Sequence, residues 1–327
     1  MHSRRDLIKG GLAAGILAAS GSPFAQGAWP GKPVRVINPF PAGGGTDAFL
    51  RPVAARLSQI LGQQFTVENL GGAGGTVGAA AAAKAPADGY TLFCGAVHHT
   101  IAESLYTRLP YNLERDFMPI TVLAYIPNVV VVHPKYTEIN TLADFLAYAR
   151  KNPGKLNYGS AGNGTSHHLT VELFKQMTKT FMTHIPYRGA GPMMQDLLAG
   201  SVDFAFDGMG TSAAQIKGGK LKALAVTSAK RVPAFPNLPT MDESGIKGYQ
   251  ATTWYALWAV KGTPPEVVTR IQQEVAKLMQ EPSIKESWFN QGAEAGGNTP
   301  AELSKFIRAE IEKWALVVKA SGAKIDL

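Results

Sequence analysis

Three consecutive glycines at 43–45 are the residues of this sequence best suited to bind a small ligand. They follow a β-branched segment at 34–37 and precede a segment at 50–61 whose apolar residues recur at helical spacing. Glycines in such a strand-to-helix turn leave backbone N–H groups free of Cβ interference, and the helix dipole favours an anion there. The turn therefore predicts a binding site for a carboxylate or a phosphate.

Three further segments share this design, in which a strand end, small residues and a helix start follow one another. They lie at 71–76, 160–166 and 187–192. Ligands of open α/β sheets bind outside the carboxyl ends of the strands, so all four loops could face one cleft. One glycine-rich turn often only reverses the chain, but four of them together favour a binding site.

A dinucleotide-binding enzyme is the first alternative. Gly43-x-Gly45-x-x-Ala48 fits the dinucleotide fingerprint, and Glu68 follows about 20 residues later, where an acid would bind the ribose. Against this alternative, two prolines separate the strand from the glycines, and Asp47 places a carboxylate where a pyrophosphate would lie. An exported Rossmann-type oxidoreductase therefore stays open as the competing hypothesis.

The histidine pairs at 98–99 and 167–168 suggest a second alternative, a metal-binding carrier. Neighbouring residues point to different faces of a strand or helix, so a pair rarely supplies two ligands to one ion. We expect one histidine of each pair to contact an anionic ligand. Nucleophilic catalysis has little support, because no serine lies in a Gly-x-Ser-x-Gly motif, and we predict neither an enzyme nor a cofactor.

The N-terminal segment resembles an export signal rather than part of the fold. Arg4 and Arg5 precede an apolar run that is too short to anchor the chain in a membrane, and small residues follow up to Ala25. The paired arginines are typical of twin-arginine signals, with a general secretory signal as the alternative. We therefore expect residues 1–25 to be a signal peptide and the mature protein to be periplasmic.

Composition limits the remaining functions. The 327 residues, 45% of them hydrophobic and 17% charged, suffice for two cores, so two domains are expected. The net charge of +8 is spread without a basic run, which argues against nucleic acid as a partner and favours anionic solutes. A single cysteine, Cys94, excludes an intrachain disulfide.

Strand-like and helix-like segments alternate along the chain, which predicts α/β folding with parallel strands. Apolar segments at 119–124 and 129–132 predict two strands, and a second α/β series begins beyond Pro134. Residues 228–248 carry no periodicity and are expected to connect that series to an apolar strand at 252–260. Two amphipathic helices are predicted to close the chain.

Ordered motifs from about residue 30 onward carry a family resemblance. These motifs are Pro39-Phe40-Pro41-Ala42-Gly43-Gly44, Glu68-Asn69, Ala87-Asp88-Gly89-Tyr90, Leu109-Pro110-Tyr111, Asn157-Tyr158-Gly159-Ser160 and Pro186-Tyr187-Arg188-Gly189. In this order they resemble the Bug-type solute receptors of tripartite tricarboxylate transporters. The resemblance implies a periplasmic two-domain "Venus flytrap" that closes on a small carboxylated solute and delivers it to membrane transporter subunits. We expect such a receptor to act as a monomer, with domain 1 at 29–126 plus 250–327 and domain 2 at 127–249.

The resemblance also carries over a set of binding residues. The loops that grip the ligand carboxylate correspond to 42–44 and 187–191, one from each domain, and other residues lie at or beside the cleft. The expected ligand-binding residues are Phe40, Ala42, Gly43, Gly44, Asp47, His98, His99, Ser160, Thr165, Tyr187, Arg188, Gly189, Ala190, Gly191 and Asp207. His98 and His99 lie in a loop that varies widely in the family, so the sequence leaves open whether the solute is aliphatic, aromatic or an amino acid.

Overall fold

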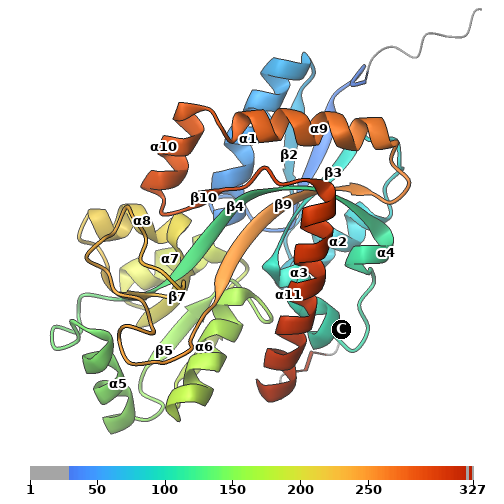
Figure 1. Ribbon diagram of the computed structural model, residues 1–327. Coiled ribbons are helices and arrows are strands. Elements are labelled where there is room, and N and C mark those ends of the chain that lie inside the picture. The colour runs from blue at the N-terminus through green and yellow to red at the C-terminus, as the bar shows by residue number, and fades with distance from the viewer. Residues whose placement is uncertain (1–28, 322–323, 326–327) are drawn as a thin grey trace, which may run out of the picture.

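A continuous mixed sheet forms the frame of the molecule in the computed structural model, which describes residues 29–321 and 324–325 (Figure 1). Within these residues, the strand order is β2-β1-β3-β9-β4-β7-β5-β6, and β8 and β10 each pair with β4. The strands are β1 (Val34–Asn38), β2 (Phe65–Asn69), β3 (Thr91–Ala96), β4 (Phe117–Val132), β5 (Asn157–Ser160), β6 (Thr183–Pro186), β7 (Phe204–Gly208), β8 (Lys222–Val226), β9 (Thr252–Val260) and β10 (Glu294–Ala295). The predicted export signal at 1–25 lies outside the described residues.

Helices cover both faces of this sheet (Figure 1). They are α1 (Gly45–Leu61), α2 (Thr76–Ala83), α3 (Val97–Leu105), α4 (Leu113–Asp116), α5 (Leu142–Lys151), α6 (Ser166–Thr178), α7 (Ala190–Ala199), α8 (Met209–Lys217), α9 (Pro265–Leu278), α10 (Pro282–Asn290) and α11 (Pro300–Ser321), with a 3₁₀ turn η1 at Ala73–Gly75. Side chains alternate along β9, so that Trp254 and Trp258 enter one core and Tyr255 and Leu257 enter the other. The two cores therefore lie on opposite faces of the sheet, and each extends along most of its length.

The segments expected to form two strands at 119–124 and 129–132 form one strand, β4, so that prediction was wrong. Pro127 lies between the two predicted segments, where β4 stops pairing with β9 and begins to pair with β7 and β8. A residue without an N–H group is tolerated at such a change of partner. β4 therefore runs through both halves of the sheet.

Strand β9 is apolar because helices cover both of its faces, but it is antiparallel to both neighbours, β3 and β4. The general expectation of parallel strands therefore does not hold for β9, whereas β1, β2 and β3 are parallel to one another, as are β5, β6 and β7. The carboxyl ends of these two parallel groups carry the glycine-containing loops. The sheet thus places both sets of loops at the middle of the molecule.

Three helices were not predicted: α4, α8 and α10. Each buries only one to three side chains and so has no long apolar stripe, and periodicity alone therefore does not reveal them. His98 and His99 were expected in a loop but lie in the first turn of α3. Among the described residues, no helix is long and apolar enough to cross a membrane.

Candidate functional site

The four glycine-containing loops come together where the two halves of the sheet meet. A methyl group added at Gly189 would lie 3.1 Å from Cδ of Pro41, and one added at Gly191 would lie 3.3 Å from the carbonyl oxygen of Ala42. Similarly, Gly74 approaches the carbonyl oxygen of Asn163, and Gly75 approaches the ring of Phe40. The absence of a Cβ at these glycines lets the facing loops approach each other closely.

Asp47 fixes the first of these loops. Its Oδ2 accepts hydrogen bonds from the Gly43 N–H (3.1 Å) and from Nε of Arg51 (2.8 Å), and its Oδ1 accepts from the Asn38 amide (3.0 Å). Burial alone would raise the pKa of Asp47, but the bonds from Arg51, Gly43 and Asn69 outweigh burial and lower it. Asp47 is thus an ionised residue that shapes the loop, and the N–H of Gly43 is already engaged.

Two helices begin at this junction, one from each side. Gly44 is the N-cap residue of α1 and Gly189 is that of α7, and neither helix start has a side-chain cap. A methyl group at Gly44 would lie 4.0 Å from Cβ of Ala190, so the two helix starts are in contact. Uncapped N–H groups and two positive dipole ends give this junction the capacity to bind an anion.

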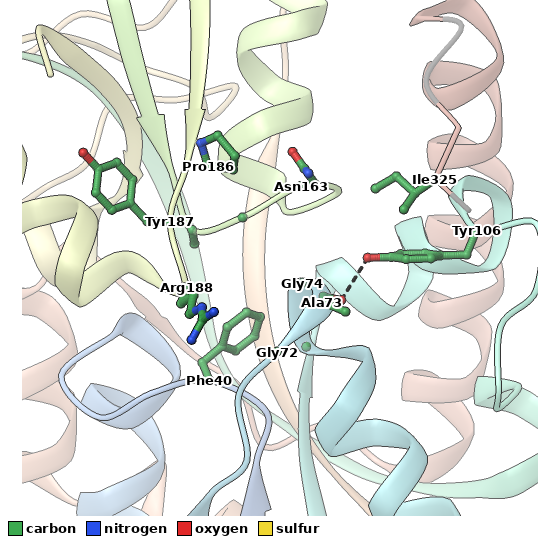
Figure 2. Close-up of a pocket in the computed structure, with 13 residues that line it drawn as sticks. Phe40, Gly72, Ala73, Gly74, Tyr106, Asn163, Pro186, Tyr187, Arg188 and Ile325 are labelled. Carbon is green, nitrogen blue, oxygen red and sulfur yellow. Dashed lines mark hydrogen bonds between the residues drawn. The ribbon is translucent and has the colours of Figure 1, made fainter. Parts of the chain in front are cut away.

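A cavity of about 350 Å³ opens beside the junction (Figure 2). Both sides of the junction line it: Phe40, Gly72, Ala73, Gly74, Gly75, Tyr106, Ala161, Gly162, Asn163, Pro186, Tyr187, Arg188 and Ile325. The Tyr106 hydroxyl donates to the carbonyl of Ala73 (2.9 Å), which secures the 72–75 loop. The volume suits a small organic molecule.

Arg188 and Tyr187 differ in exposure and in partners. The Arg188 side chain is exposed and lies beside the ring of Phe40 (Figure 2). The Tyr187 hydroxyl donates to Oδ2 of Asp196 (2.6 Å), and burial together with this bond raises the pKa of Tyr187 to about 12. Arg188 is therefore positioned at the rim of the cavity, whereas the Tyr187 side chain is held by Asp196 of α7.

Ser160 and Thr165 shape the 160–166 loop. Oγ of Ser160 lies 2.6 Å from Nε2 of His184 and accepts from the Gly162 N–H, while Thr165 donates to the Gly162 carbonyl (2.7 Å). Both side chains are fully buried. Their oxygens are engaged in the loop itself, so they position its backbone.

The two histidines of the 98–99 pair have different surroundings. His99 contacts the Ala96 backbone through Nδ1 and lies 3.4 Å from the Gly75 carbonyl through Nε2, and burial lowers its pKa to about 4. Nδ1 of His98 accepts from the Ser166 N–H (3.0 Å), and its ring packs edge-on against Phe40. His99 thus has a structural role, and His98 joins α3 to α6.

Asp207 lies at the end of β7, fully buried, and Oδ2 accepts from the hydroxyls of Thr211 and Ser212. Its other oxygen lies 3.6 Å from Nδ1 of His167, a residue absent from the expected set. The 167–168 pair was the only sequence signal for His167, and the pair alone does not show which ring faces the junction. Among the described residues, no cluster of three or more side chains could hold a metal ion.

Comparison with known proteins agrees with this geometry. Residues 49–323 match the model of the "tripartite tricarboxylate transporter family receptor". The protein BugT of Bordetella pertussis is 36% identical over 310 residues, which is 94% of this chain and 95% of BugT.

Two solved structures share the whole fold. Rpa4515 of R. palustris, solved with adipate, is 38% identical, has a TM-score of 0.88 and covers 91% of this chain and 100% of its own. MatC of Rhodopseudomonas palustris, solved with malate, is 30% identical, has a TM-score of 0.84 and covers 89% of this chain and 100% of its own. The chain has the periplasmic binding protein fold and belongs to the receptor family of tripartite tricarboxylate transporters, a family of solute-binding proteins rather than enzymes.

Proposed function

We propose that this protein captures a small organic mono- or dicarboxylate in the periplasm and delivers it to the membrane subunits of a tripartite transporter. The observation that carries the proposal is the contact between two uncapped helix starts, at Gly44 and Ala190, beside a cavity of about 350 Å³. Helix N-termini with free N–H groups favour carboxylates. The bound adipate and malate in the two relatives support the same solute class.

Two domains, 29–126 plus 250–327 and 127–249, are proposed to close around the solute. The chain passes between them through β4 near Asn128 and again just before β9. At this crossing, Thr227 donates to the carbonyl of Ala251 (2.6 Å), and Thr253 donates to Oδ1 of Asn128 (2.7 Å). This buried hydrogen-bonded crossing is a suitable hinge, because it fixes the strands while the loops beyond it separate.

A thermal-shift screen of mono- and dicarboxylates tests the solute class. We expect at least one carboxylate to raise the melting temperature of the full-length mature protein in a concentration-dependent way. Stabilisation by NAD or a divalent metal, with none by any carboxylate, would contradict the proposal.

X-ray scattering of the same protein tests the closure. The radius of gyration is expected to decrease when a saturating carboxylate is added, because each half of the anion-binding site belongs to a different domain. The scattering should also give the mass of a monomer. An unchanged radius would indicate a rigid, preformed pocket.

A further inference from the structure

Two buried imidazoles face each other behind Phe40, one from each proposed domain. His98 lies in the first turn of α3 and His167 in the first turn of α6; they are 5% and 3% exposed, and their ring centroids lie 6.2 Å apart with perpendicular planes. Within the described part of the chain, neither ε-nitrogen makes a hydrogen bond, and neither is among the fully buried unpartnered atoms, which include Nδ1 of His167. Both ε-nitrogens are therefore free to bind a ligand at the junction, whereas the buried Nδ1 of His167 faces Asp207.

The hydrogen bond at Nδ1 determines where the proton of His98 resides. Nδ1 accepts from the Ser166 N–H and therefore carries no proton. Burial, reinforced by the neighbouring His167 and His99, lowers the pKa of His98 well below its usual value, so the ring is neutral. A neutral ring with a bare Nδ1 has its proton on Nε2. His98 thus offers one fixed donor.

Asp207 orients the second ring. Nδ1 of His167 lies 3.6 Å from Oδ1 of Asp207, and neither atom has a hydrogen-bond partner among the described residues. Because Thr211 and Ser212 donate to the other oxygen of this carboxylate, Asp207 is held as an acceptor beside the imidazole. The N–H of His167 therefore points to Asp207. Nε2 of His167 is then an acceptor in the neutral ring and a donor in the protonated ring.

We propose that His98 and His167 bind the second carboxylate of a dicarboxylic solute, and that His167 takes up one proton from solvent when it binds. This inference rests on the proposed function, in which the helix starts at Gly44 and Ala190 hold the first carboxylate. Nε2 of His98 donates to one carboxylate oxygen, and Nε2 of protonated His167 donates to the other. The pair distinguishes a dicarboxylate from a monocarboxylate of the same length.

Electrostatics sets the direction of the proton linkage. Asp207 from β7 and His98 from α3 face His167, and the Tyr255 hydroxyl of β9 lies near it, since a Cβ at Gly208 would be 3.9 Å from Nε2 of His167 and 4.0 Å from that hydroxyl. Burial raises the pKa of Tyr255, which stays neutral, and burial lowers the pKa of His167 more than Asp207 raises it. With neutral His167, the buried cluster bears the single negative charge of Asp207, which repels a second anion. A bound carboxylate raises the pKa of His167, so binding takes up a proton and weakens as the pH rises.

Calorimetry on the unmodified protein tests the inference directly. Succinate, glutarate, adipate and malate are titrated at pH 7.5 in two buffers with different ionisation enthalpies, alongside butyrate and hexanoate as monocarboxylates of matched length. We expect a dicarboxylate to bind more tightly than its matched monocarboxylate and to take up close to one proton. Its Kd should rise up to about tenfold per pH unit over the range where His167 titrates.

Histidine-to-asparagine variants identify the groups. Asparagine keeps polar atoms near the δ position, so His98→Asn retains an acceptor for the Ser166 N–H and His167→Asn retains a donor for Asp207, while both lose the ε-nitrogen. His167→Asn should abolish the proton uptake, and either variant should weaken dicarboxylate binding at least tenfold with less effect on monocarboxylates. His133→Asn is the matched control, since Nδ1 of His133 also accepts a backbone N–H, that of Lys135, far from the junction.

The outcomes separate this inference from the proposed function. If no carboxylate binds the unmodified protein, the proposed function itself fails. If carboxylates bind without proton uptake, or with equal affinity for matched mono- and dicarboxylates, the inference is overturned and the proposed function stands. Should either variant fail to fold, the two-buffer measurement on the unmodified protein still decides.

Discussion

Gly191 offers a direct test of domain closure, because a methyl group there affects stability and binding in opposite directions. Gly191 lies in the first turn of α7 with ordinary backbone angles, so alanine should stabilise this helix by up to about 1 kcal/mol. The same methyl would lie 3.3 Å from the Ala42 carbonyl oxygen and 3.7 Å from the Gly43 carbonyl carbon, both across the junction. Gly191→Ala should therefore raise the melting temperature without solute and weaken solute binding.

Valine at position 191 should weaken solute binding more than alanine does. Overpacking typically costs about 1–3 kcal/mol, and here that cost falls on the closed state alone, so Gly191→Val should raise the Kd by about 5- to 150-fold. The assay is isothermal titration with the tightest-binding carboxylate, together with scattering at saturation. Gly31→Ala is the control, since its methyl would lie 3.7 Å from the Tyr90 hydroxyl, away from the junction. Unchanged affinity and full compaction in Gly191→Val would refute the idea that the two loops approach this closely in the bound state.

Three further predictions concern charged groups. Because the pKa of Asp47 is lowered, its carboxylate stabilises the fold at neutral pH, and this contribution is lost as acid protonates it below about pH 4. In urea unfolding, Asp47→Asn should therefore reduce the fall in the free energy of unfolding between neutral and acid pH. Because Arg188 is exposed, Arg188→Ala should raise the Kd less than about fivefold and mainly reduce the salt dependence of the on-rate, measured by stopped flow. A larger loss of affinity would place Arg188 inside the site. Glu310→Ala should cost about 2–4 kcal/mol in urea unfolding, because it leaves the indole N–H groups of Trp254 and Trp314 unpaired; a cost below about 1 kcal/mol would contradict this role.

The sequence predicted the elements whose local signals are strong. Alternating apolar strands and the two amphipathic helices α9 and α11 were correctly identified, because each buries a long stripe or a continuous apolar run. It failed at β4, which was predicted as two strands, since only the tertiary arrangement reveals that one strand continues through Pro127 while it changes partners. The short helices α8 and α10 are stabilised by a few buried side chains that local periodicity does not reveal.

The sequence predicted which loops form the candidate site, but not which side chains face it. Glycines at strand ends mark the loops, and the structure brings those loops together. Sequence spacing does not show which polar atoms are already engaged, as the N–H of Gly43 is by Asp47. It also does not show which histidine of a pair faces the junction. His98 and His99 are neighbours in α3 and point in different directions, so that His98 faces the junction and His99 has a structural role.

Without a bound anion, the junction brings together groups whose electrostatic interactions are unfavourable. The positive dipole ends of α1 and α7 meet through Gly44 and Ala190, and Asp47 in the first turn of α1 offsets part of their repulsion. Behind them, the carboxylate of Asp207 is buried beside an imidazole that burial keeps neutral. In the proposed complex a dicarboxylate would relieve both conditions, because its first carboxylate would lie between the helix starts and its second would favour protonation of His167. If the two proposed domains close as inferred, the free energy of closure would come from the solute, and the empty receptor would remain open.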